Sequence, residues 1–231
     1  MSNPNSNAIA ARPRMTVKTV TSLAMLSALT YLAMLLSNLL PKVSGFLQME
    51  IKGTVIAIGG FLFGPLSAAV VSIVVALLEM FTVSETGPIG CIMNLLAACA
   101  FACPAAWIYQ KNRSKKGAVA GLTVGVVVLT VVMLLWNYLI TPIYMDMDRS
   151  LVAGMLPTVF LPFNLVKGGL NMALTLILYK PVVTALRKTG LAPEREGMAP
   201  SGDRFDAGFL LFSLALLATF TLLVLVLAGK I

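Results

Sequence analysis

The chain has 231 residues, of which 58% are hydrophobic and 11% are charged. A soluble domain carries about 25% charged residues, so this composition excludes an ordinary soluble protein and indicates one whose solvent is the lipid bilayer. The net charge of +8 does not predict a nucleic-acid partner, because the basic residues lie in short segments beside apolar runs, where the positive-inside bias of membrane proteins explains them.

The apolar runs predict an all-α integral membrane protein with seven membrane segments. Residues 1–16 are polar and are predicted to form a cytoplasmic tail, and residues 189–206 are predicted to be a polar linker. The additional transmembrane helix after that linker, within residues 207–231, is almost pure Leu, Phe, Val, Ala and Thr, so we expect it at the periphery, facing lipid. The predicted segments are residues 17–40, 53–63, 66–81, 89–109, 118–140, 156–179 and 207–228.

The second and third segments are short, and Gly64-Pro65 separates them. At about 1.5 Å per residue, residues 53–63 are too short to cross a hydrocarbon core of about 30 Å as a regular helix. If both segments formed one span, the basic cluster at 111–116 would lie outside and the acidic 146–148 loop inside, against the positive-inside rule. We therefore predict two helices joined by a Gly-Pro hinge, with the N-terminus in the cytoplasm.

The sixth segment carries a polar face within hydrocarbon. Asn164, Lys167 and Asn171 are spaced i, i+3 and i+7, which places them on one side of a helix. A lysine inside the bilayer costs about 3 kcal/mol on insertion scales, so it normally faces a bundle interior or a water-filled cavity. This pattern favours a ligand or ion pathway, and a lysine paired with a carboxylate purely for packing is the structural alternative.

Other polar side chains are predicted to lie at the same depth. Asn can donate and accept hydrogen bonds, Lys donates them and ionised Glu accepts them, a mixture that suits a hydroxylated heteroaromatic molecule. Agreement in depth across four helices favours a shared site that opens outward over separate interhelical hydrogen bonds. The residues at this depth are Glu79, Asn94, Asn137, Asn164 and Lys167, with Gln48 and Glu50 in the outer loop between the first two segments.

Several chemistries are excluded or disfavoured. The chain has no histidine, which excludes histidine-based metal sites, catalytic triads and proton relays. Cys91, Cys99 and Cys103 lie in one predicted span and are interpreted as packing residues, so no metal site is predicted. The sequence contains no Gly-x-x-x-x-Gly-Lys-Ser/Thr motif, so uphill transport would need a partner or a coupling ion.

Five stretches, taken in order, carry a resemblance to a known family. They are residues 50–66 (EIKGTVIAIGGFLFGPL), 79–82 (EMFT), 86–90 (TGPIG) with Asn94, 137–145 (NYLITPIYM) and 161–167 (LPFNLVK). Over about residues 17–188, the chain resembles the riboflavin-specific S component of energy-coupling factor (ECF) transporters, which is the substrate-binding membrane subunit.

The resemblance implies a fold and a complex. It implies a six-helix S-component bundle over residues 17–188, multi-pass in a prokaryotic cell membrane, to which the predicted helix at 207–228 is an addition. The bundle would bind riboflavin from outside, as a transported ligand with no separate cofactor. A transmembrane coupling subunit and two ABC-type ATPases would drive its release inward, so the chain itself is not expected to be an enzyme.

The resemblance also assigns roles to particular residues. Asn137, Asn164 and Lys167 match positions that contact the ligand, and residues Leu47, Gln48 and Met49 match a loop whose backbone helps to enclose it. Ala24 and Ala28 form a small-x-x-x-small pair that lets another helix approach closely, and the resemblance assigns them to docking on the coupling subunit.

One departure from the family pattern precedes the second helix. Members often show Asp-x-Lys-Asp there, whereas this chain has Glu50-Ile51-Lys52-Gly53, which leaves the details of loop closure open. Three other functions also stay open: an S component for another vitamin or precursor, a secondary transporter, and a membrane scaffold or assembly subunit whose polar residues only hold helices together.

Overall fold

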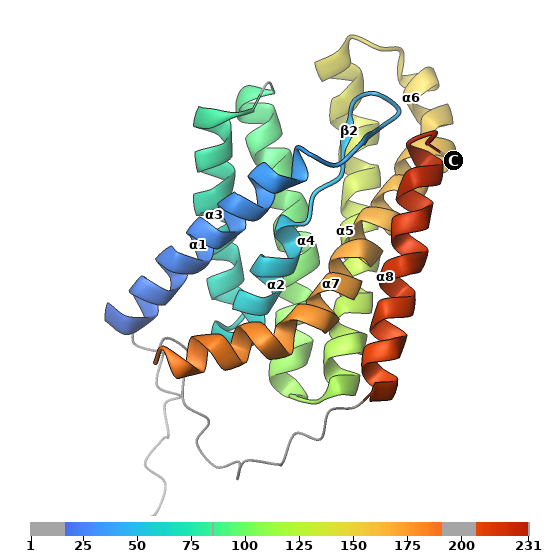
Figure 1. Cartoon of the computed structure of the whole chain (residues 1–231). Coiled ribbons are helices and arrows are strands. Elements are labelled where there is room, and N and C mark those ends of the chain that lie inside the picture. The colour runs from blue at the N-terminus through green and yellow to red at the C-terminus, as the bar shows by residue number, and fades with distance from the viewer. Residues whose placement is uncertain (1–16, 85, 191–206, 231) are drawn as a thin grey trace, which may run out of the picture.

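The computed structural model of the chain describes residues 17–84, 86–190 and 207–230, without the side chain of Arg187. The predicted tail at 1–16, and most of the predicted linker at 189–206, lie outside the described residues. The described elements are mostly helical (Figure 1): α1 (Val17–Ser37), β1 (Lys42–Val43), β2 (Leu47–Gln48), α2 (Lys52–Phe63), α3 (Pro65–Thr82), α4 (Gly87–Lys111), α5 (Lys115–Met145), α6 (Arg149–Met155), a π-helical segment (Leu156–Phe160), α7 (Leu161–Lys188) and α8 (Ala207–Leu227).

The predicted helical membrane fold is confirmed, including its short second helix. Within the described residues, six helical stretches are long and apolar enough to cross a bilayer, and α2, with 12 residues, is shorter. Gly64 separates α2 from α3 with a φ of 100°, a conformation that residues with a Cβ rarely adopt, and Pro65 starts α3. The Gly-Pro hinge therefore breaks the chain into two helices where the charge argument placed the break.

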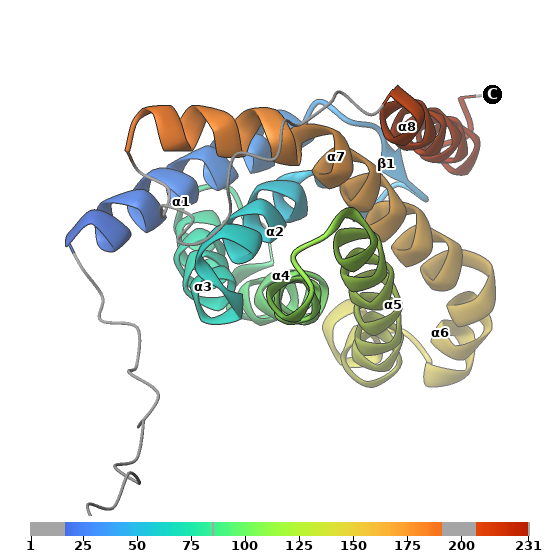
Figure 2. The ribbon, with the colours of Figure 1, turned by 90° about the horizontal axis from the view of Figure 1, so that it is seen from below.

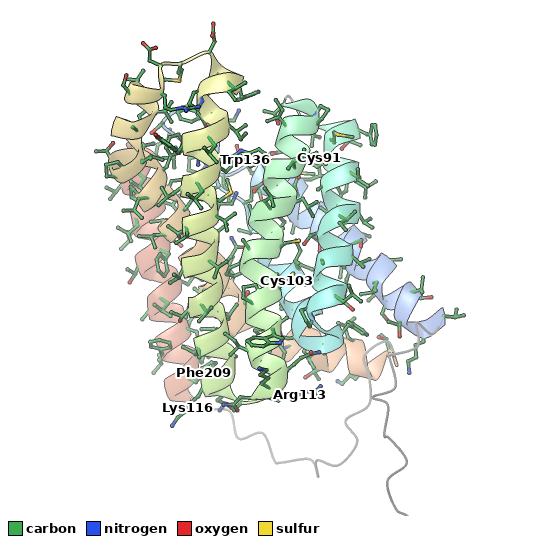
Figure 3. The ribbon with its side chains drawn as sticks, turned by 180° about the vertical axis from the view of Figure 1, so that it is seen from behind. Cys91, Cys103, Arg113, Lys116, Trp136 and Phe209 are labelled. Carbon is green, nitrogen blue, oxygen red and sulfur yellow. The ribbon has the colours of Figure 1, made fainter. Side chains whose placement is uncertain are left out.

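The bundle has two different ends (Figure 1). The hairpin end carries the β1–β2 hairpin together with the α3–α4 and α5–α6 connections. The opposite end carries the α4–α5 connection, where Arg113 and Lys116 lie (Figure 3). At that end the C-terminal part of α7 runs across the base of the bundle, as the view from below shows (Figure 2).

Small residues bring α4 and α5 into close contact. A Cβ added at Gly121 would lie 2.7 Å from the carbonyl oxygen of Ala105, and one added at Gly125 would lie 2.4 Å from that of Phe101. The two backbones therefore touch at positions where only glycine fits, as is common between membrane helices. This close packing forms the centre of the hydrophobic core.

The structure shifts several predicted boundaries. The first helix ends at Ser37 instead of residue 40, α5 continues to Met145, and α7 begins at Leu161 and continues to Lys188. Helix α5 runs through Pro142 and α7 through Pro181, since membrane helices tolerate a proline whose freed backbone groups find other partners.

The last helix lies at the margin, as predicted. Only Ser213 and Val224 of α8 are buried, and α8 packs mainly on α7. The view from below shows it beside α7 and β1, away from α1, α3 and α4 (Figure 2).

Candidate functional site

A cavity of about 450 Å³ lies at the hairpin end of the bundle. Side chains from α1, α3, α4, α5, α7 and the segment between α1 and α2 line it. Its volume falls within the range of about 300–1,000 Å³ that is typical of small-molecule sites. Among the lining residues are seven of the sequence-predicted site residues, namely Leu47, Gln48, Glu79, Asn94, Asn137, Asn164 and Lys167.

Met49 is the predicted site residue that does not line the cavity. Its side chain is fully buried in a separate apolar cluster that includes Val43, Phe163 and Val166. The resemblance implied that the backbone of this loop, not its side chains, helps to enclose the ligand. The position of the Met49 side chain does not test that role, which stays a prediction.

Four charged side chains form a continuous chain of ion pairs, and three of them, Glu50, Glu79 and Lys167, line the cavity. Nζ of Lys167 lies 2.5 Å from Oε2 of Glu50, and Nζ of Lys52 lies 2.7 Å from Oε1 of Glu50. Nζ of Lys52 also lies 2.6 Å from Oε2 of Glu79. The network therefore joins the start of α2 to α3 and α7, and Glu50 and Lys52 share it as the central pair.

The network contains two carboxylates and two ammonium groups, so their charges compensate. Burial alone would raise the pKa of Glu50, but the ammonium groups of Lys167 and Lys52 outweigh this effect and hold that pKa at about 2. Glu50 is thus ionised at neutral pH. Its carboxylate supplies the opposite charge that a lysine within the membrane needs. Lys167 also lines the cavity, and its ammonium has three N–H donors, so its pairing with Glu50 leaves it able to bind a ligand.

Asn171, the third residue of the predicted polar face, supports the start of α2 instead of the main cavity. Its Oδ1 accepts a hydrogen bond from the backbone N–H of Thr54 at 2.9 Å, and its Nδ2 donates to the carbonyl oxygen of Glu50 at 2.7 Å. A Cβ added at Gly53 would lie 2.9 Å from Oδ1 of Asn171. The departure from the family pattern at Gly53 therefore makes room for this asparagine.

Asn137 and Asn164 project into the cavity from facing helices and are held by their own helices. Nδ2 of Asn137 donates to the carbonyl oxygen of Met133 at 2.7 Å, and Nδ2 of Asn164 donates to that of Phe160 at 2.8 Å. Oδ1 of Asn137 also accepts a hydrogen bond from the Thr141 hydroxyl at 3.0 Å. These local bonds fix the orientation of both amides, and each NH₂ group retains a second N–H donor.

Sequence reasoning missed the apolar part of the cavity wall and one member of the ion-pair network, which does not itself line the cavity. Lys52 was not assigned to the site, although its spacing from Glu50 just before a buried apolar helix could have suggested a paired role. The apolar lining was not predicted by residue, because Met and Phe are abundant in membrane helices and carry no signal of their own. This lining includes Met34, Phe46, Met93, Met133 and Phe163.

Ala24 and Ala28 lie outside the cavity. Both are exposed on the outer surface of α1, one helical turn apart. Their small side chains would let another helix approach the backbone of α1 closely.

Three comparisons place these features among known proteins. A family model described as the substrate-specific component of ECF transporters matches residues 18–179. The chain is 27% identical over 177 residues to the riboflavin transporter RibU of Staphylococcus aureus, covering 74% of this chain and 93% of that protein. It is 28% identical over 168 residues to the riboflavin transporter FmnP of Bacillus subtilis, covering 67% of this chain and 86% of that protein.

A solved structure, that of the S component of a bacterial ECF transporter, is also similar. It matches with a TM-score of 0.63 and 27% sequence identity, over 74% of this chain and 98% of the other. The matched lengths show that these relatives align over nearly their whole chains.

Proposed function

This chain belongs to the family of substrate-specific components of ECF transporters, and from this premise we propose that the cavity at its hairpin end binds riboflavin. The curated relatives that support this ligand are named riboflavin transporters. The observation that carries the proposal is the meeting of Asn137, Asn164 and Lys167 in one cavity whose apolar lining consists mostly of Met and Phe.

The chemistry of that wall suits the vitamin. The polar edge of the isoalloxazine ring offers carbonyl acceptors, an imide donor and ring nitrogens, which the two amides and the ammonium of Lys167 can match. Apolar side chains such as Met133 and Phe163 would cover the faces of the ring. The ion-pair network carries no net charge, which fits a ligand that is itself uncharged at neutral pH.

The absorption spectrum of the purified chain tests the ligand. We expect bound flavin, or saturable quenching of riboflavin fluorescence after the flavin is removed, and we expect no competition from thiamine or biotin. Competition by another vitamin that exceeds that of riboflavin would assign the cavity to a different S-component ligand. Absence of any vitamin binding would favour a scaffold.

The cavity is proposed to open to the outside of the cell, with the N-terminus in the cytoplasm. Arg113 and Lys116 lie at the end away from the cavity (Figure 3), whereas Asp146 and Asp148 lie beyond α5 at the hairpin end. Cytoplasmic loops of membrane proteins carry the excess of Lys and Arg. In a variant without native cysteines, Ser150→Cys should react with an impermeant maleimide on intact cells, and Arg113→Cys should react only after lysis; the reverse pattern would invert the topology.

Delivery inward is proposed to need an ECF coupling subunit and two ATPases, with α1 as the docking surface. Ala24→Trp and Ala28→Trp would block close approach of a partner helix, because both positions face outward. Riboflavin uptake should fall, while riboflavin binding by the isolated chain stays unchanged. Uptake that persists without any ATPase partner would instead favour a secondary transporter.

A further inference from the structure

Helix α8 lies beyond residue 179, where the match to the family model ends. It packs along α7 through a fitted contact: a Cβ added at Gly169 would lie 2.1 Å from Cζ of Phe220. The ring of Phe220 therefore occupies the space that a side chain at position 169 would fill. At the start of the helix, Phe209 lies beside Lys115 of α5, with Nζ 5.6 Å from the ring centroid. These contacts attach α8 to the bundle at a defined position.

The other end of α8 reaches the segment that connects α1 to α2, which we call the hairpin segment (residues 38–51). Val224 is buried in an apolar cluster with Val43 and Met49 of that segment. Leu227, one turn further along α8, packs against the same cluster, as does Leu47. The view from below shows β1 between α7 and α8 (Figure 2). The hairpin segment is thus held between the two helices.

This cluster lies directly behind the cavity. Leu47 and Phe163 each line the cavity and also pack in the cluster that contains Val224. The apolar cluster that contains Val224 therefore also forms part of the cavity wall.

The hairpin segment has few internal interactions to hold it. Its two strands pair over only two residues each, and a short isolated hairpin is at best marginally stable. Nε2 of Gln48 donates to the carbonyl oxygen of Ser37 at 2.6 Å, which fixes one side of the segment to the end of α1. At the end of the segment, Glu50 is joined to α7 by its ion pair with Lys167 and by the hydrogen bond from Asn171 to its carbonyl oxygen. Apolar packing against α7 and α8 holds the two strands.

We infer that α8 is a positioning helix for the binding site: it holds the hairpin segment against α7 and thereby slows the exit of the ligand. The inference rests on the proposed binding of riboflavin, since it assigns α8 a part in retaining that ligand. Because ligand exit requires a wall of the cavity to move, contacts that resist this movement act mainly on the dissociation rate.

Point variants of the full chain test this role. Val224→Ala removes buried methyl groups, and Leu227→Ala partly buried ones, from the apolar cluster that α8 shares with the hairpin segment. Val226→Ala is the matched control, because Val226 belongs to the same helix and is 54% exposed. Protein loaded with riboflavin is diluted into an excess of a competing ligand that does not fluoresce. The recovery of riboflavin fluorescence then gives the dissociation rate.

We expect Val224→Ala and Leu227→Ala to raise the dissociation rate by about three-fold to ten-fold each, with the association rate changed less, and Val226→Ala to leave both rates unchanged. Equal dissociation rates in all four proteins would overturn the inference, and so would an equal rise in the Val226→Ala control.

A second measurement separates failure of this inference from failure of the proposed function. Amide hydrogen exchange of residues 38–51 in the ligand-free chain should be faster in Val224→Ala than in Val226→Ala, whatever the ligand is. If exchange rises but riboflavin does not bind the wild-type chain, the positioning role stands and the proposed ligand is wrong. If exchange is the same in both variants, α8 does not hold the segment.

Discussion

The two ends of the bundle differ: the hairpin end encloses a cavity, whereas the opposite end contains a packed cluster of aromatic rings and small residues. At the opposite end, the rings of Phe61 and Tyr109 stack with centroids 4.2 Å apart, and the hydroxyl of Tyr109 is hydrogen-bonded to that of Tyr179. A Cβ added at Gly60 would lie 2.8 Å from that of Ala106. At the hairpin end, α1, α3, α4, α5, α7 and the segment between α1 and α2 enclose about 450 Å³.

The difference follows from the side chains that each end presents. Small residues and interlocking rings let helices close on one another at the opposite end. At the hairpin end, the charged side chains pair with one another, and the amides of Asn137 and Asn164 donate hydrogen bonds to backbone carbonyls of their own helices. A bundle can thus carry an open binding site because its other end supplies the packing that keeps the helices together.

The largest loss of stability is expected at Lys52, a central member of the ion-pair network that joins the start of α2 to α3 and α7 at the hairpin end. Lys52→Met would leave Glu79 without its ammonium partner and Glu50 with Lys167 alone. Breaking a buried ion pair costs about 3–5 kcal/mol, so thermal unfolding in detergent should occur at a clearly lower temperature. Lys42→Met is the control, since Lys42 also lies at the hairpin end but is exposed. A Lys52→Met chain as stable as the control would show that the network does not hold this end together.

A smaller loss of stability is expected when a side chain is added to the packed contact between α4 and α5. Gly125→Ala would place a Cβ 2.4 Å from the carbonyl oxygen of Phe101, which forces α4 and α5 apart and should cost about 1–3 kcal/mol. Gly154→Ala is the matched control, because a Cβ there meets nothing within 4 Å. Equal melting temperatures in the two variants would contradict the close approach of α4 and α5.

The smallest loss of stability is expected from Tyr109→Phe. This variant keeps the ring that stacks on Phe61 and removes one hydroxyl of the Tyr109–Tyr179 pair, at a cost of about 0.5–1.5 kcal/mol. Riboflavin affinity should stay unchanged, because Tyr109 belongs to the opposite end. A weaker affinity, measured by fluorescence quenching, would mean that the two ends are coupled.

Much of the fold could be predicted from the sequence, because long apolar runs and a charge asymmetry are strong signals. The break at Gly64 followed from segment length and from the positions of basic residues. The β1–β2 hairpin was missed, since its strands have two residues each and no periodicity can be read from them. The π-helical segment at Leu156–Phe160 also has no sequence pattern by which we could have predicted it.

The sequence could predict the site residues that share one depth in the membrane. It could not predict ion pairs between residues that are far apart in the sequence. Asn137, Asn164 and Lys167 share one level across α5 and α7, which the predicted topology could show. Glu50 and Lys167 are 117 positions apart, so their ion pair required the tertiary structure. Asn171 shares a helix face with Lys167, but it lies one turn further along α7, where it contacts the start of α2 instead of the main cavity.

The riboflavin affinity of Lys167→Met tests most directly whether the cavity at the hairpin end is the binding site. It is measured by fluorescence quenching and compared with that of the wild-type chain. The substitution keeps the length of the side chain and removes its donors and charge, while Glu50 retains Lys52 as a partner. Loss of one charge-assisted hydrogen bond in a water-poor site should weaken binding by about ten-fold to a hundred-fold. An unchanged affinity in a folded Lys167→Met chain would contradict the account, because this lysine would then serve only the ion-pair network.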